Sequence, residues 1–264
     1  MLGKRLFGKR KIHRKVDDDV SVEVSEIDGI RSLHLGSETV QSSMRLSDPV
    51  ELVLSYTRAM MAFQLFLPRP RHVAMIGLGG GSLAKHVYHR MPCTRTTVIE
   101  QQPQVIAAAR QYFHVPGDDE RFSVELGEGS TWVAAHPRCC DVLMVDGYDG
   151  NAQVEELCSE GFYADARDAL SDPGILVVNL WSSDIRFDAY LQRIERVFEA
   201  VLCVPAEKRG NVAVLAFTRA PGRPRWDDLR AGARQLQDQY GLEFLRFVEG
   251  LRELNPHSAS RLEV

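Results

Sequence analysis

The 264-residue sequence predicts an α/β protein with a doubly wound, parallel sheet. Apolar, strand-like segments alternate with amphipathic helical segments through the middle of the chain, which is the pattern of consecutive βαβ units. The first of these strands runs into the glycine turn Gly77-Leu78-Gly79-Gly80-Gly81, a helix follows, and the next strand ends in Glu100. A strand, glycine turn, helix and strand-terminal acid in this order indicate a nucleotide-binding unit.

Bulk composition limits the class of protein. With 44% hydrophobic residues, a chain of this length buries a full core, as one large domain or one domain with a small appendage. The net charge of −4 gives no reason to expect a nucleic-acid partner. No apolar run approaches the ~20 residues needed to cross a bilayer, so no membrane partner is expected. The five cysteines lack CxxC spacing, so neither a disulfide framework nor a metal site is predicted, and the cytoplasm is the expected location.

The N-terminal part is predicted to hold a tail and a small β subdomain. Residues 1–19 are expected to be a basic, disordered tail, because the run of lysines and arginines ends directly in an acidic run. The β subdomain is expected over residues 20–48. Residues 20–27 alternate apolar with polar side chains, and Asp28-Gly29 is a hairpin signal. Two further extended segments are expected at residues 30–35 and 39–44.

Residues 49–264 are predicted to form the main domain. Pro49 stands at the start of a helical pattern that continues to Phe63. The strands expected in the central sheet are residues 73–76, 96–99, 122–126, 142–145 and 174–180. The helices expected between them follow the glycine turn and occupy residues 103–112, 131–135 and 159–169. Residues 201–204 and 212–217 indicate an antiparallel hairpin at the sheet edge, and residues 226–247 indicate closing amphipathic helices.

Glycines and acids come directly after each predicted strand, where a parallel sheet places its ligand. In chain order they are the glycine turn, Glu100, Glu128, and the pair Asp146 and Asp149. A carboxylate in the position of Glu100 accepts hydrogen bonds from two ribose hydroxyls. Glu128 has two interpretations: an acceptor for an adenine amino group, or an ordinary solvated carboxylate in a turn between two glycines.

The segment from Asp146 to Asp149 places two carboxylates beside Tyr148, with a glycine that allows a substrate to approach closely. Paired carboxylates bind a cationic substrate, and in a partly desolvated pocket one of them accepts a proton from it. The alternative for both acids is a turn or a helix cap.

Several segments together carry a resemblance to a known family. They are Gln41, Tyr56, Gly77 to Gly81, Val98-Ile99-Glu100, Gly127-Glu128-Gly129, Val145 to Asp149, Gly161-Phe162-Tyr163 and Ala169 to Val177. With them the sequence resembles the spermidine synthase (polyamine aminopropyltransferase) family over about residues 20–217. The resemblance implies a Rossmann-like sheet of the class I methyltransferase type, preceded by a small N-terminal β-hairpin subdomain.

The resemblance also implies an activity: transfer of an aminopropyl group from decarboxylated S-adenosylmethionine to putrescine or a related amine, with release of methylthioadenosine. The donor is a co-substrate, so no tightly bound cofactor is expected. The residues implied to bind it are Gly77, Gly79, Gly81, Glu100, Gln101, Glu128 and Gly129. Asp146 is implied as the catalytic acid-base residue, and the residues implied to hold the small-molecule amine are Gln41, Tyr56, Tyr148 and Asp149. A homodimer or tetramer is implied as well.

The chain departs from the pattern of that family at several positions. The glycine turn has Gly80 where the family usually has an acid, and Thr57 and Arg58 stand where a His-Glu or Gln-Glu pair is usual. Because each buried ammonium needs a partner, the loss of these carboxylates is expected to weaken polyamine binding unless other groups replace them.

Two other functions stay open. An S-adenosylmethionine-dependent methyltransferase would use the same Glu100 and glycine turn, but it needs a cationic or amide partner for a carboxylate that the decarboxylated donor lacks. A relative without turnover, which binds a nucleoside or another protein, would explain the missing carboxylates, although Asp146 and Asp149 have little use in it. A nicotinamide-dependent enzyme is disfavoured because no second catalytic lobe follows the fifth strand.

Overall fold

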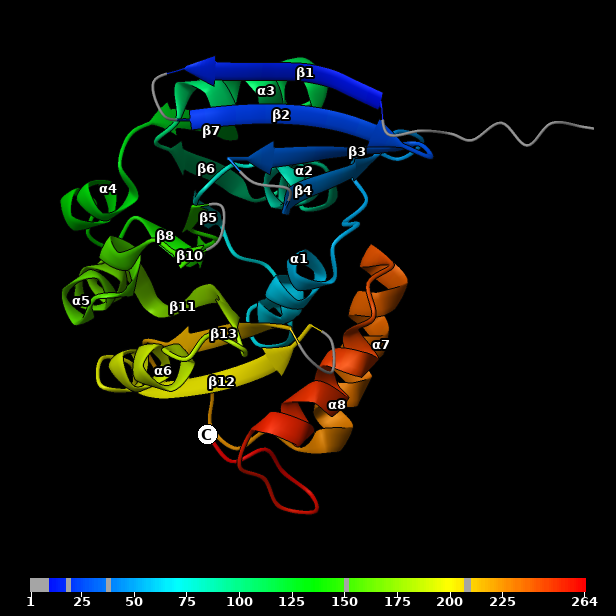
Figure 1. The fold of residues 1–264 in the computed structure, drawn as a ribbon. Coiled ribbons are helices and arrows are strands. Elements are labelled where there is room, and N and C mark those ends of the chain that lie inside the picture. Colours follow the sequence, from blue (N-terminus) through cyan, green and yellow to red (C-terminus); the bar gives the residue numbers. More distant parts are fainter. Residues whose placement is uncertain (1–9, 18–19, 37–38, 150–151, 207–209) are drawn as a thin grey trace, which may run out of the picture.

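The computed structural model describes residues 10–17, 20–36, 39–149, 152–206 and 210–264. At residues 10, 14–17, 20, 148, 149, 152 and 153 it describes the backbone alone. The described residues form a small antiparallel N-terminal sheet and a larger α/β domain around a seven-stranded sheet (Figure 1). The predicted fold class is therefore confirmed.

The N-terminal sheet has four antiparallel strands in the order β1-β2-β3-β4. They are β1 (Arg10–Asp17), β2 (Val20–Ile27), β3 (Ile30–Leu35) and β4 (Val40–Arg45). Asp28 and Gly29 join β2 to β3 with φ angles of 49° and 76°. Two consecutive positive φ angles characterise a tight hairpin turn whose twist matches that of the strands. The predicted hairpin at Asp28-Gly29 is confirmed.

Strand β1 corrects the expectation of a disordered tail through residue 19, because residues 10–17 pair antiparallel with β2. The basic residues of this segment hide an alternation of partly buried and exposed side chains along the strand. Ile12 packs against the hydrophobic core, while Lys11 donates a hydrogen bond to Glu23 of β2 at 2.9 Å. The rest of the predicted tail, residues 1–9 and 18–19, lies outside the described residues.

The central sheet has the strand order β12-β13-β11-β8-β5-β6-β7. Its strands are β5 (His72–Ile76), β6 (Arg95–Glu100), β7 (Phe122–Leu126), β8 (Cys140–Val145), β11 (Leu170–Trp181), β12 (Ala200–Pro205) and β13 (Asn211–Phe217). Strands β5 to β8 and β11 run parallel, whereas β13 pairs antiparallel with both β11 and β12. The predicted edge hairpin is confirmed. Two short strands, β9 (Tyr148–Asp149) and β10 (Ala152–Gln153), pair separately.

Helices cover both faces of the central sheet (Figure 1). On one face lie α1 (Ser55–Met60), the 3₁₀ helix η1 (Met61–Leu65), α2 (Ser82–Arg90), α3 (Pro103–Tyr112), α7 (Trp226–Tyr240) and α8 (Phe244–Leu254). On the other lie α4 (Gly129–Ala135), the 3₁₀ helix η2 (Glu155–Cys158), α5 (Glu160–Ala169) and α6 (Phe187–Glu195). A hydrophobic core lies on each face of the sheet. Successive residues of β8 point to opposite faces, as side chains of a strand do: Val142 packs into the core under the first group of helices and Leu143 into the core under the second. Helix α6 is not predicted from the sequence.

The helix predicted to start at Pro49 begins later, at Ser55. The Arg58 guanidinium donates hydrogen bonds to the carbonyl oxygens of Leu52 and Val53, at 3.1 and 2.8 Å. These two carbonyl oxygens accept hydrogen bonds from a side chain. The segment that leads into α1 is therefore irregular, although its apolar residues are spaced as in a helix.

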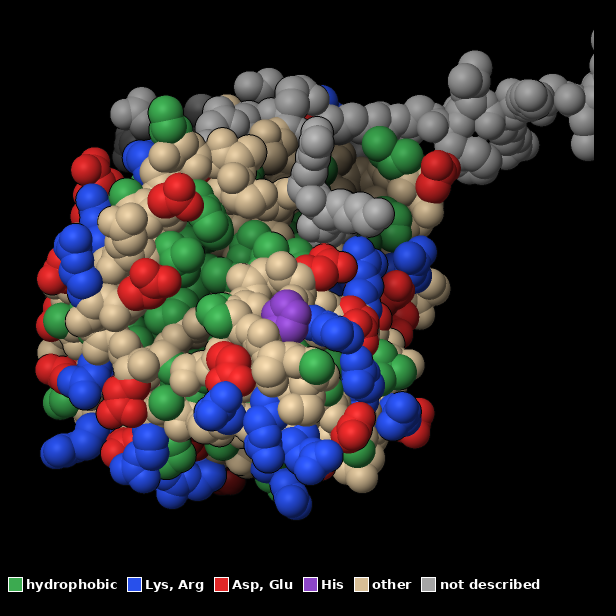
Figure 2. All heavy atoms as spheres, turned by 90° about the horizontal axis from the view of Figure 1, so that it is seen from below, with side chains coloured by type: hydrophobic (Ala, Val, Ile, Leu, Met, Phe, Trp, Pro, Cys, Tyr) green, Lys and Arg blue, Asp and Glu red, His purple; other side chains and the backbone are tan. Residues whose placement is uncertain are grey.

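Surface charges of both signs intermingle. In the view from below, lysine and arginine side chains gather along one margin with acidic side chains among them (Figure 2). Surface ion pairs include Arg219 with Asp172 at 2.6 Å and Arg196 with Glu160 at 3.2 Å. Among the helices that the structure describes, none is long and apolar enough to span a bilayer.

Arg31 fastens the N-terminal sheet to the larger domain. Its guanidinium donates to the carbonyl oxygen of Tyr112, the last residue of α3, at 2.7 Å, and to Glu26 at 3.0 Å. A cation at the C-terminal end of a helix also interacts favourably with the helix dipole. Because β3 and β4 carry Leu35 and Gln41 toward the cavity described below, this contact helps to position that site.

We expect Arg31→Met to lower the free energy of unfolding by about 1.5–3 kcal/mol, because it removes hydrogen bonds donated by a charged group and leaves the Tyr112 carbonyl oxygen without this partner. Urea denaturation followed by circular dichroism measures the change. Arg45→Met is the matched control: Arg45 lies on β4 and pairs with Glu51, but both side chains are exposed, so little change is expected. Equal losses in the two variants would contradict an anchoring role for Arg31.

Candidate active site

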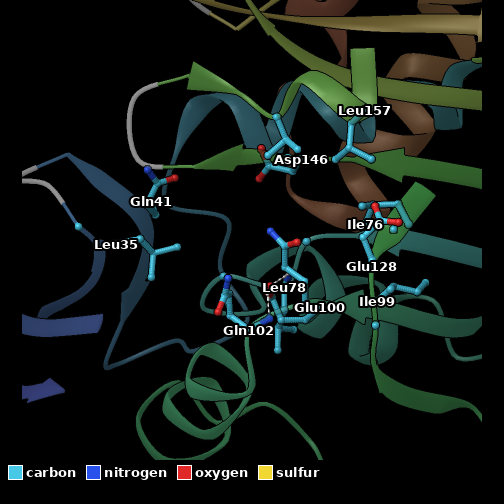
Figure 3. Close-up of a pocket in the computed structure, with 18 of the residues that line it drawn as sticks. Leu35, Gln41, Ile76, Leu78, Ile99, Glu100, Gln102, Glu128, Asp146 and Leu157 are labelled. Atoms are coloured by element: carbon cyan, nitrogen blue, oxygen red, sulfur yellow. Dashed lines mark hydrogen bonds between the residues drawn. The ribbon is translucent and has the colours of Figure 1, made fainter. Parts of the chain in front are cut away.

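A cavity of about 280 Å³ opens at the carboxyl ends of β5, β6 and β8, between the central sheet and the N-terminal sheet (Figure 3). Its lining residues are Ser21, Leu35, Gly36, Gln41, Ile76, Gly77, Leu78, Gly79, Ile99, Glu100, Gln101, Gln102, Gly127, Glu128, Gly129, Asp146, Gly147, Val154 and Leu157. Gln41 and Leu35 approach from the N-terminal sheet, Asp146 lies on one wall, and Glu100 with Gln102 lies across from it (Figure 3). The cavity therefore needs both sheets.

The glycine turn is shaped by close backbone contacts. The amide of Gly77 donates to the carbonyl oxygen of Ile99 at 2.9 Å, and its φ is 92°. A Cβ at Gly77 would lie 2.5 Å from the backbone oxygen of Asp146, so glycine is required there. At Gly79, φ is 53° and a Cβ would meet Ser42 at an ordinary 3.6 Å.

The other two glycines of the turn serve packing. A Cβ at Gly80 would lie 2.8 Å from Ser42 Oγ and 2.9 Å from Phe113 Cδ1. The space that an acid would occupy is thus filled by the N-terminal sheet and by the end of α3. Gly81 does not line the cavity, because it precedes α2 and a Cβ there would lie 2.4 Å from Val115.

Glu100 ends β6 and is only 8% exposed. Its Oε2 accepts from the amide of Leu78 at 3.0 Å, and its Oε1 accepts from the amide of Gln102 at 2.9 Å. Burial raises the pKa of the Glu100 carboxyl, and the backbone amides oppose this rise. The backbone amides of Gln101 and Gly79 also approach this carboxyl. A carboxylate at the end of a strand that lines the cavity is suited to accept from neighbouring hydroxyls of a ribose.

Both interpretations of Glu128 describe part of its surroundings, because it lines the cavity and also caps the N-terminus of α4. Its Oε1 accepts from the Ser130 amide at 2.8 Å. Its Oε2 accepts from the Ser130 hydroxyl at 2.8 Å, the Thr131 amide at 2.8 Å and the Thr131 hydroxyl at 2.6 Å. Partial burial alone would raise the pKa of Glu128, but these four hydrogen bonds outweigh it and lower the pKa to about 2. Only Oε1 keeps capacity for a further donor, such as an adenine amino group.

Asp146 follows β8, and its amide donates to the carbonyl oxygen of Ile76 at 3.1 Å. Its Oδ1 accepts from Asn179 Nδ2 at 2.8 Å. The Tyr56 hydroxyl lies 3.1 Å from the carbonyl oxygen of Gln41 and also within hydrogen-bonding reach of the Asp146 carboxylate, so these two acceptors share its single proton. Burial raises the pKa of Asp146, and the bonds from Asn179 and Tyr56 oppose this rise. A carboxylate with increased proton affinity in a cavity is suited to act as a general base.

A small recess adjoins the main cavity and shares Gln41, Gly77, Leu78, Gly79 and Asp146 with it. Its volume is about 20 Å³, which holds one group of the size of a water molecule or an ammonium. Tyr56 lines this recess. Oxygen atoms of Asp146, Tyr56 and Gln41 therefore converge on a space that suits a single amine nitrogen.

Most of the predicted site residues meet here. Gln41, Gly77, Gly79, Glu100, Gln101, Glu128, Gly129 and Asp146 line the cavity, and Tyr56 lines the recess. The side chains of Tyr148 and Asp149 lie outside what the structure describes.

Asn179, Leu35 and Leu157 are parts of the site that the sequence reasoning missed. Asn179 had a detectable signal, because it is the one polar residue in the apolar run from Ile175 to Leu180, and a buried amide needs a partner.

Comparison with known proteins agrees with this geometry. The sequence profile described as the spermine/spermidine synthase domain matches residues 53–206, more than half of the chain. A polyamine aminopropyltransferase from Chromobacterium violaceum is 42% identical over 255 residues, covering 96% of this chain and 98% of its own. Another, from Neisseria meningitidis serogroup A, is 45% identical over 245 residues, covering 92% of this chain and 93% of its own.

Among solved structures, a spermidine synthase in complex with the transition state analogue AdoDATO superposes with a TM-score of 0.73. The match covers 92% of this chain and 85% of that chain, at 20% sequence identity. It shows that the two proteins share a fold.

We expect Gly77→Ala to destabilise the protein by about 3 kcal/mol or more, because it combines backbone strain at positive φ with a collision against the Asp146 backbone. Gly79→Ala is the matched control: its φ is also positive but its Cβ has room, so a loss of about 1–2 kcal/mol is expected. Thermal and urea unfolding measure both. If the two variants lose the same stability, the close approach of Gly77 to Asp146 does not constrain the fold.

Proposed function

The chain belongs to the spermine/spermidine synthase family, and from this premise we propose that it is a polyamine aminopropyltransferase. The proposed donor is decarboxylated S-adenosylmethionine, and the proposed acceptor is putrescine or a related amine. The single observation that carries this choice of substrates is the charge of the cavity. Its described lining residues include three carboxylates, Glu100, Glu128 and Asp146, and no lysine, arginine or histidine.

This charge distribution favours cationic ligands. The decarboxylated donor carries a sulfonium and an ammonium, and a diamine carries two ammonium groups. S-adenosylmethionine has an additional carboxylate, and a dinucleotide has a pyrophosphate. An anionic group buried without a positive partner is unfavourable, and the described lining residues offer no cationic side chain to either group. The amides of Gln41, Gln101 and Gln102 line the cavity as neutral groups, and the net charge of its described lining is negative. This charge supports aminopropyl transfer over methyl transfer.

The donor is proposed to lie along the glycine turn. Glu100, which the amides of Leu78 and Gln102 hold in place, would accept from the ribose hydroxyls. Oε1 of Glu128 would accept from the adenine amino group. The apolar side chains that line the same cavity and would contact the adenine ring are Leu35, Ile76, Ile99 and Leu157.

The amine is proposed to enter the recess beside Asp146. An alkylammonium has an unperturbed pKa of about 10.4 and no free lone pair, so it must lose a proton before it attacks. Asp146 accepts that proton, while Tyr56 and the Gln41 carbonyl oxygen accept hydrogen bonds from the remaining N–H groups. The nitrogen then forms a bond to the propyl carbon, the bond from that carbon to sulfur breaks, and its electron pair stays on sulfur. The products are the aminopropylated amine and neutral methylthioadenosine.

Further parts of the proposal concern the distal amine, the assembly and the location. Tyr148 and Asp149 are proposed to hold the distal part of the amine, and a homodimer or tetramer is proposed as the assembly. The cytoplasm is the proposed location, which agrees with five cysteines that are all free thiols.

Calorimetric titration with methylthioadenosine, decarboxylated S-adenosylmethionine and S-adenosylmethionine, each with and without putrescine, tests the proposal. We expect preference for the decarboxylated donor and release of methylthioadenosine once putrescine is added. A preference for S-adenosylmethionine would assign methyl transfer instead. Binding to none of them would leave a relative without turnover.

We expect Asp146→Asn to lower kcat by about 10²- to 10⁴-fold, because it removes the base. Asparagine still offers an oxygen to Asn179, so the affinity for methylthioadenosine should stay within a few-fold of the wild-type value. Steady-state kinetics and calorimetry measure the two quantities. Parallel losses of affinity and kcat would contradict the assigned role.

We expect Glu100→Gln to weaken methylthioadenosine binding by more than about 10-fold, since charged hydrogen bonds to the ribose contribute about 1.5–3 kcal/mol. Glu125→Gln is the control, because Glu125 lies on the exposed part of β7 and bonds to Trp132 outside the main cavity. Dissociation constants for methylthioadenosine, measured by calorimetry, compare the two variants with the wild-type protein. An unchanged affinity in Glu100→Gln would place the ribose elsewhere.

A further inference from the structure

Asn179 is a buried amide in an apolar strand. It lies on β11, is 2% exposed, and interrupts the apolar run that ends at Leu180. Burying an amide is unfavourable unless its donors and acceptor find partners. The partners of Asn179 should therefore account for its presence.

Both ends of the Asn179 side chain are engaged. Its Nδ2 donates to Asp146 Oδ1 at 2.8 Å, and its Oδ1 accepts from Asn211 Nδ2 at 2.9 Å. Asn211 begins β13 and pairs with Trp181 across the antiparallel ladder. A chain of two amides thus leads from the edge hairpin to the carboxylate of Asp146.

The direction of this chain depends on the charge of Asp146. An ionised carboxylate only accepts hydrogen bonds, so Asn179 must turn its NH₂ group toward it. The Asn179 oxygen then faces Asn211, which must present its own NH₂ group. The two amides are therefore ordered as donors toward an ionised Asp146, whereas a protonated carboxyl, which also has an O–H donor, would not require this order.

We infer that Asn179 and Asn211 are positioning residues for Asp146, which hold its carboxylate ionised in a partly buried place and fix its orientation through Oδ1, so that it can accept the proton of the substrate. As a statement about the reaction this inference rests on the proposed function. As a statement about Asp146 it stands by itself.

Other groups near Asp146 do not replace these amides. Tyr56 from α1 hydrogen-bonds the carboxylate, and Glu100 and Glu128 line the same cavity as further acids. Burial raises the pKa of Asp146. The amide of Asn179 opposes this effect, so its loss should raise the pKa of Asp146 further and leave less ionised base at neutral pH.

The test measures the ionisation of Asp146 directly, by carbon-detected NMR titration of protein with ¹³C-labelled aspartate and without any ligand. Asp146→Asn identifies the resonance. Asn179→Leu removes the donor at similar volume. Asn211→Asp places an acceptor beside Asn179, so the Asn179 amide should turn its NH₂ group away and present its oxygen to Asp146.

We expect the pKa of Asp146 to rise by roughly one unit or more in Asn179→Leu and to rise in the same direction in Asn211→Asp. The acidic limb of the pH profile of kcat/KM should move to higher pH by the same amount, with the KM for the donor unchanged. Asn255→Leu is the matched control: Asn255 is also buried, but it bonds to the backbone of Cys203 on β12 and should change stability without moving the pKa of Asp146.

The outcomes separate the inference from the proposed function. If the pKa of Asp146 is the same in Asn179→Leu, Asn211→Asp and wild type, the positioning role is wrong, whether or not aminopropyl transfer occurs. If the pKa rises in both variants but not in Asn255→Leu, the positioning role holds. Absence of aminopropyl transfer by the wild-type protein would then refute the proposed reaction alone.

Discussion

The site depends on the close approach of two backbone segments, where the glycine turn after β5 meets Asp146, the residue that follows β8. Gly77 has no space for a Cβ, because that atom would lie 2.5 Å from the Asp146 carbonyl oxygen. The two strands are neighbours in the sheet, so this contact fixes where the carboxylate leaves β8 relative to the turn. The Asp146 amide bonds to Ile76 on the same edge, which holds the base on the wall of the cavity.

Three acids close to this contact have different environments and therefore different uses. Glu100 is buried, and backbone amides that bond to it oppose the rise in its pKa, so it suits recognition of hydroxyls. Glu128 is exposed and accepts four hydrogen bonds, which lower its pKa to about 2 and leave it little affinity for a proton. Burial also raises the pKa of Asp146, against the hydrogen bonds of Asn179 and Tyr56. Asp146 differs from Glu100 in position, because Asp146 lines the recess beside Tyr56 and Glu100 does not. Environment and position together thus assign the proton acceptor among residues that are chemically alike.

The fold and the outline of the site could be predicted because both follow from periodic patterns. Strand-end residues such as Glu100 and Asp146 converge on one edge whatever the detail of packing. The parts that could not be predicted depend on contacts between distant segments. Residues 10–17 form a strand in which Ile12 packs against the hydrophobic core. Helix α1 starts late because Arg58 donates hydrogen bonds to carbonyl oxygens of the preceding segment. The role of Asn179 becomes clear only once the fold places it beside Asp146.

The glycine at position 80 shows how a departure from a family pattern follows from packing. Ser42 and Phe113 occupy the space that a side chain would need, and Ser42 Oγ lies 3.1 Å from Ser82 Oγ, so the N-terminal sheet is joined to the start of α2 by neutral hydroxyls. An acid in the turn would separate these elements and would also leave a charge between them. Among the side chains that the structure describes, the negative charge of the cavity therefore lies on Glu100, Glu128 and Asp146. These acids attract a cation because no positively charged side chain stands among the described lining residues.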